Sequence, residues 1–140
     1  MDNIDKIRFK ILKVREFVDK IKPYQRMTVE KLEQDHLKSA AIERYLQLTV
    51  DMCVDIAEIV GTDQRLKSPE DGTDAILILG KENIIEEEFA KEFSRAVGFR
   101  NILVHQYVDI DYGQVADVLN NRLDEFEEYC QQIAKHYEIK

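Results

Sequence analysis

Polar residues interrupt an apolar stretch between residues 98 and 107 of the 140-residue chain, and four of them could do chemistry together: Arg100, Asn101, His105 and Tyr107. At about 100° per residue of a helix, Asn101 and His105 are neighbours four apart. Arg100 and Tyr107 are seven apart and nearly eclipsed, so that all four side chains fall on about one half of the helix surface. The spacing therefore predicts one patch that combines a strong cation, a base that titrates near neutrality, an amide and a phenol.

These groups suit cleavage of a phosphodiester bond in RNA without a metal ion. RNA carries its own nucleophile, the 2′-OH, and the unperturbed histidine pKa of about 6.5 makes His105 the natural general base. The forked guanidinium of Arg100 matches phosphate oxygens better than an ammonium does. Asn101 would hold His105 or a phosphate oxygen in place. From spacing alone, a structural cluster of hydrogen-bonded side chains at a helix end is the alternative interpretation.

The composition predicts one all-helical domain over residues 1–140. Charged residues make up 34% of the chain and hydrophobic residues 44%, with only 5 Gly and 2 Pro. Few breakers and many charges favour long surface helices over a turn-rich β fold. No apolar stretch reaches the roughly 18 residues of a membrane span, and the first residues do not resemble a signal peptide. We expect a cytoplasmic protein without a membrane partner.

Hydrophobic periodicity predicts an antiparallel bundle of four main helices with one or two short ones. The main helices are expected over residues 4–22, 35–60, 84–98 and 111–136, and the short ones over 28–34 and 73–79. Pro23 should stop the first helix, Thr28 should cap the next, and Gly61 should end the third.

The helix expected over residues 35–60 carries an apolar surface broad enough for burial against more than one neighbour. The centre of its stripe is predicted at Leu37, Ala41, Tyr45, Leu48, Met52, Ile56 and Ile59. A second set widens it: Ala40, Leu46, Val50, Cys53, Val54, Ala57 and Val60.

The net charge of −8 argues against a general nucleic-acid binder, which is usually basic. Residues 1–26 nevertheless hold 8 basic and 4 acidic side chains. An acidic protein can bind RNA through a local basic cleft, because the field at the site decides binding. The alternative for this basic end is a solvated helix face.

Cysteine and histidine usage predicts neither a metal site nor a cofactor. Cys53 and Cys130 are far apart within helical patterns, which is typical of reduced, buried thiols, whereas zinc needs more ligands at closer spacing. His36 and His136 are expected on the surface.

The segment around His105 resembles the R-x(4–6)-H-x-Y motif of the HEPN superfamily, with Arg100 and Tyr107 at the other motif positions. Its form is similar to that of the HepT-type toxins encoded beside minimal nucleotidyltransferases (MNT). Residues 43–47 and 55–57 are similar to the family's second helix. Since the helical layout and length also agree, the resemblance covers nearly the whole chain.

This resemblance implies a homodimeric, metal-independent endoribonuclease, the toxin of a type VII-like toxin–antitoxin system. Two motifs would face each other across the dimer, with Arg100 and His105 catalytic. The MNT antitoxin would silence the toxin by transferring AMP from ATP to Tyr107. RNA, and not DNA, is the implied substrate. Two alternatives stay open: a non-catalytic HEPN module that binds a nucleotide or a partner, and a purely structural helical subunit.

Overall fold

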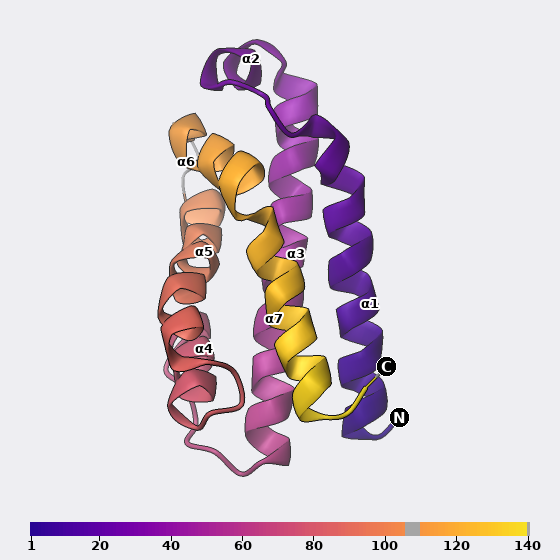
Figure 1. The fold of residues 1–140 in the computed structure, drawn as a ribbon. Coiled ribbons are helices and arrows are strands. Elements are labelled where there is room, and N and C mark those ends of the chain that lie inside the picture. Colours follow the sequence, from indigo (N-terminus) through magenta and orange to yellow (C-terminus); the bar gives the residue numbers. More distant parts are fainter. Residues whose placement is uncertain (106–109, 140) are drawn as a thin grey trace.

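The computed structural model describes residues 1–105 and 110–139, with residues 102, 104 and 105 described through the backbone alone. Helices and short connections make up this part of the chain, which contains no strand (Figure 1). The predicted all-α antiparallel bundle is therefore confirmed. Its elements are α1 (Asn3–Ile21), η1 (Lys22–Tyr24), α2 (Val29–Gln34), α3 (His36–Asp63), α4 (Gly72–Lys81), α5 (Glu87–His105), α6 (Tyr112–Asp117), η2 (Val118–Arg122) and α7 (Leu123–His136).

The helix α3 is the central element of the bundle. It lies antiparallel beside α1 along most of its length, and the hairpin of α4 and α5 packs against its other side (Figure 1). α7 contacts both α1 and α3. Within the described ranges, no helix is long and apolar enough to cross a membrane.

Short polar side chains begin the helices, as the sequence predicts for Thr28. Its hydroxyl accepts a hydrogen bond from the Lys31 amide, which satisfies one of the free donors of the first turn of α2. Carboxylates act in the same way at four other helices: Asp2, Asp35, Asp71 and Asp111. α1 ends at Ile21, next to the 3-10 turn that contains Pro23, since proline cannot continue a helix.

An aromatic cluster centred on Phe93 joins α5 to α7. The Phe93 ring stacks on Tyr129 at 4.7 Å between centroids and meets the Phe126 ring edge-on at 5.7 Å. All three side chains are fully buried. The Tyr129 hydroxyl donates a hydrogen bond of 2.9 Å to the backbone carbonyl of Cys53 on α3. The cluster therefore ties three helices together and fixes the axis of α5.

The turn η2 is a π-helical interruption between α6 and α7, so the predicted helix over 111–136 has two parts. The Leu119 carbonyl in this turn accepts a hydrogen bond of 3.0 Å from the Gln25 side chain. The Asn120 side chain bonds to the backbone of Arg26 and of Met27. η2 thus holds the connection between α1 and α2.

The predicted phase of the long apolar stripe was wrong in the first half of α3. Leu37 is 85% exposed and Ala41 is exposed, whereas Ile42 and Leu46 are buried. α1 and α2 cover this half from one side, which leaves the side with Leu37 open. The widening set supplies most of the core in the second half, with Val50, Cys53, Ala57 and Val60.

Three predicted helix ends also move. α3 continues past Gly61 to Asp63, and α5 begins at Glu87 and runs to His105 instead of ending at residue 98. Ile84 and Ile85 are buried just ahead of α5. The longer α5 carries Arg100, Asn101 and the backbone of His105 on one continuous helix.

Candidate functional site

Arg100 lies near the carboxyl end of α5 and forms an ion pair with Asp51 of α3. Its Nε donates a hydrogen bond of 2.8 Å to Asp51 Oδ1, and the two side chains are 36% and 32% exposed. Charge-assisted bonds of this kind fix geometry more strongly than neutral ones. In residues 1–105 and 110–139, neither Nη group of Arg100 has a hydrogen-bond partner. The guanidinium is therefore held at one edge and can offer the other edge to a phosphate.

Asp51 is a site residue that the sequence interpretation missed. It stands in an apolar run of α3, between Leu48 and Val54, where a carboxylate is rare unless it is paired. That signal indicates a partner but does not name it, because Arg100 lies 49 positions further along the chain.

A groove of about 480 Å³ opens beside this ion pair, between the middle of α3, the start of α4 and the last turns of α5. Arg100 and the exposed Asn101 both line it. His105 ends α5, roughly 7.5 Å further along the helix axis than Arg100. The side chain of His105 is not described, and Tyr107 lies outside the described residues. The convergence of all four motif side chains stays a prediction.

The lining of the groove is acidic. It includes Asp51, Asp55 and Asp71 against one cation, Arg100. Asp55 is paired with Lys10 of α1, whose Nζ lies 3.2 Å from Oδ2. A polyanion that enters the groove therefore meets one guanidinium among several carboxylates, and it needs cations beyond the groove to bind well.

The helices α4 and α5 approach each other closely near the turn that joins them. A Cβ added to Gly80 would lie 2.5 Å from the Cβ of Ala90, so a larger residue cannot fit at this crossing. At the start of α4, a Cβ on Gly72 would lie 3.0 Å from Val54 of α3. The Gly80 contact therefore packs α4 on α5 within the hairpin, and the Gly72 contact packs the start of α4, which lines the groove, against α3.

Glu43 is a half-buried carboxyl group on α3, two turns ahead of Asp51. Burial raises its pKa above the usual value. Its Oε1 is buried and has no hydrogen-bond partner among the residues that the structure describes. The Tyr112 pKa is also raised, first by burial and then by the charges of Glu43 and Glu33. This end of α3 therefore holds an unfavourable acidic charge.

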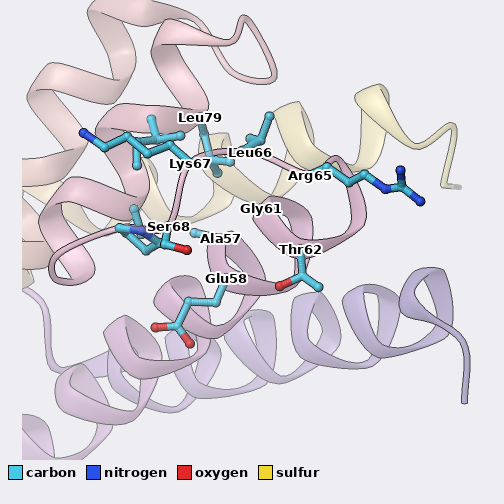
Figure 2. Close-up of a pocket in the computed structure, with 12 residues that line it drawn as sticks. Ala57, Glu58, Gly61, Thr62, Arg65, Leu66, Lys67, Ser68 and Leu79 are labelled. Carbon is cyan, nitrogen blue, oxygen red and sulfur yellow. The ribbon is translucent and has the colours of Figure 1, made fainter.

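A second cavity, of about 340 Å³, lies at the other end of α3 (Figure 2). Its apolar lining includes Ala57 and Leu79, and its polar lining includes Glu58 and Ser68. The Arg65 guanidinium extends away from it into the open (Figure 2). Neither Arg100 nor Asn101 lines this cavity.

The other predicted features are placed as follows. Cys53 and Cys130 are buried free thiols, and His36 and His136 are exposed, as expected. Within the described part of the chain, no group of three or more His, Cys, Asp or Glu side chains could hold a metal ion.

The family of the chain follows from comparison with known proteins. A family model described as "Ribonuclease HepT-like" matches residues 14–133. The chain belongs to this HepT-like ribonuclease family, which confirms the resemblance seen in the motif.

Individual relatives agree. The "tRNA nuclease HepT" of Aphanizomenon flos-aquae is 31% identical over 119 residues, which is 84% of this chain and 80% of that protein. The "mRNA nuclease HepT" of Shewanella oneidensis is 29% identical over 97 residues, 69% of this chain and 73% of that protein. A solved structure described as the tri-AMPylated Shewanella oneidensis HEPN toxin in complex with MNT antitoxin superposes with a TM-score of 0.84 at 26% identity, covering 96% of this chain and 99% of that one.

Proposed function

We propose that this chain is the ribonuclease toxin of a toxin–antitoxin pair, and that it cleaves RNA without a metal ion. The observation that carries the proposal is Arg100, held by Asp51 at its Nε edge beside an open groove. The two relatives named above are described as an mRNA nuclease and a tRNA nuclease. These descriptions support RNA as the class of substrate for this chain.

In the proposed reaction, His105 removes the proton from the 2′-OH next to the bond that is cleaved. The 2′-oxygen then attacks the phosphorus, and the 5′-oxygen leaves and takes up a proton. The products are a 2′,3′-cyclic phosphate and a 5′-OH end. The Nη edge of Arg100 stabilises the negative charge that grows on the phosphate oxygens. Asn101, at the mouth of the groove, supports His105 or a phosphate oxygen.

The decisive experiment is incubation of the pure protein with total RNA in EDTA, followed by analysis of the product ends. Cleavage should persist, and His105→Ala and Arg100→Ala should each reduce it by at least about 10²-fold. Arg95→Ala is the matched control, because Arg95 is an exposed arginine on α5 paired with Glu92. Activity that vanishes in EDTA, or that survives in both motif variants, would refute the mechanism.

A homodimer would complete the site. One motif offers a single Arg100 and a single His105, while the reaction needs two proton transfers, and a two-fold axis supplies a second pair. The apolar side chains exposed in the first turns of α3, Leu37, Ala40 and Ala41, could extend the contact between two copies beyond this shared site. Light scattering at micromolar concentration tests this point. A monomer that still cleaves RNA contradicts the shared site.

The proposed partner is an MNT nucleotidyltransferase that attaches AMP to Tyr107. The related Shewanella toxin, described as tri-AMPylated and bound to an MNT antitoxin, supports this proposal. AMP on Tyr107 would bring a phosphate to Arg100 and compete with RNA. Treatment with the cognate enzyme, ATP and Mg²⁺ should add AMP at Tyr107 and lower activity in proportion. Tyr107→Phe, which lacks the acceptor hydroxyl, should keep its activity after the same treatment. AMP on another residue, as in the alternative of a buried Tyr107, contradicts the proposal.

A further inference from the structure

Arg44 is an exposed cation on α3 that the site described above does not use. Within the described ranges its side chain has no ion pair and no hydrogen bond. Arg100, which lines the groove, and Lys10, which reaches Asp55 from α1, differ in this respect, because each is paired with a carboxylate. The charge of Arg44 is therefore available to a ligand.

Helix geometry places Arg44 on the groove side of α3. It precedes Asp51 by seven residues, so the two side chains leave the helix within about 20° of each other and roughly 10 Å apart along the axis. α3 and α5 run antiparallel (Figure 1). Moving from Asp51 to Arg44 is thus the same direction as moving from Arg100 to His105. Arg44 stands at about the height of His105.

The acidic lining of the groove leaves few cations for RNA, so RNA binding would need a further cation such as Arg44. Three carboxylates line the groove against one guanidinium. RNA binding depends on the number of phosphates that cations neutralise, and Arg100 alone accounts for one of them. Arg44 does not line the groove itself but lies beyond it on the same side of α3, where the next phosphate along the strand can be held.

We propose that Arg44 is a substrate-binding residue that holds an RNA phosphate adjacent to the one that is cleaved. The inference rests on the proposed RNA-cleaving function, and it adds a second phosphate contact, on α3, to the motif on α5. Arg44 takes no part in proton transfer. Its loss should therefore weaken RNA binding and raise KM while kcat stays near that of the wild type.

The test measures binding separately from cleavage. The probe is a fluorescent single-stranded oligoribonucleotide with 2′-O-methyl groups, which lacks the nucleophile, titrated by anisotropy at several salt concentrations. Arg44→Ala should bind about tenfold more weakly, with a salt slope smaller by about 0.7, the value for one single-strand phosphate. Arg44→Glu should bind more weakly still.

Arg65→Ala is the matched control, since Arg65 is also an exposed, unpaired arginine in the described chain but lies at the far end of α3 (Figure 2). It should bind within about twofold of the wild type. The inference is overturned if Arg44→Ala binds the probe as well as Arg65→Ala does. It is also overturned if Arg44→Ala lowers kcat without changing KM. A wild-type protein that binds the probe with this Arg44 dependence but never cleaves RNA upholds the inference and refutes the proposed function instead.

Discussion

Phe93 and Arg100 lie seven residues apart on the same face of α5, yet they are held in different ways. Phe93 is fully buried against Phe126 and Tyr129, so many non-directional contacts fix it. Arg100 is 36% exposed and is oriented by one hydrogen bond to Asp51. The first region should therefore govern the stability of the bundle, and the second should govern its activity.

The largest effect is expected in the aromatic cluster. Phe93→Ala should lower the free energy of unfolding by about 3–5 kcal/mol, because it leaves a cavity among three helices. Urea titration followed by circular dichroism measures this. Phe89→Ala is the control: Phe89 stacks on Phe93 at 5.3 Å but is only partly buried, so its loss should be smaller. A loss below about 1 kcal/mol at Phe93 would mean that α5 is held elsewhere.

Asp51→Asn should have the opposite effect to Phe93→Ala: a large loss of activity with little loss of stability. The amide oxygen can still accept the bond from Nε but carries no charge, so the guanidinium is held more weakly, and kcat should fall by about 10–100-fold. KM should not rise, because a negative charge has left the groove, and stability should change by less than about 1 kcal/mol. Asp51→Glu should restore part of kcat. Asp55→Asn, which breaks the pair with Lys10, is the matched control. Wild-type kcat in Asp51→Asn would show that Asp51 does not position Arg100.

Gly80→Ala tests the close packing of α4 on α5 within the hairpin. Its Cβ would lie 2.5 Å from that of Ala90, so α4 and α5 must separate, at about 1–3 kcal/mol. Thermal unfolding should show the loss, and adding Ala90→Gly should recover part of it.

At Gly61, inside α3, a Cβ meets nothing within 4 Å. Gly61→Ala should therefore stabilise by about 0.5–1 kcal/mol. Equal effects at both glycines would contradict the close crossing.

The smallest effect is expected at Glu43. Burial raises its pKa, so the folded state binds this proton more tightly than the unfolded state does. At a pH above the pKa that Glu43 has in the folded protein, the ionised carboxylate opposes folding. This penalty disappears as the pH falls towards the pKa that Glu43 has in the unfolded chain. Glu43→Gln should therefore stabilise the protein at pH 7, by less than about 1 kcal/mol, and lose that advantage in acid. Unfolding midpoints at several pH values measure it. A destabilised variant at pH 7 would indicate a partner for the carboxylate.

The sequence was sufficient for the features that depend on local chemistry. Few glycines and prolines predict the helices, the Thr28 hydroxyl marks the start of α2, and Pro23 marks the end of α1. The phase of α3 could not be predicted, because apolar residues such as Leu37 lie on its open side as well as on its buried side. The Asp51–Arg100 ion pair could not be predicted from the sequence for a different reason. Only the packing of α3 against α5 brings together two residues 49 positions apart.

The π-helical turn η2 has a consequence for how related chains should be aligned. Such a turn holds one residue more than the α-helical turn that it replaces, so the buried positions before and after it are offset by one. Removing one residue between Val118 and Arg122 would rotate α7 by about 100° relative to α6 and turn Tyr129 away from Phe93. It would also shift the turn whose Leu119 carbonyl accepts the hydrogen bond from Gln25. The length of this segment, more than its composition, is therefore what selection should preserve, and gaps placed here in an alignment would mark chains with a different helix register.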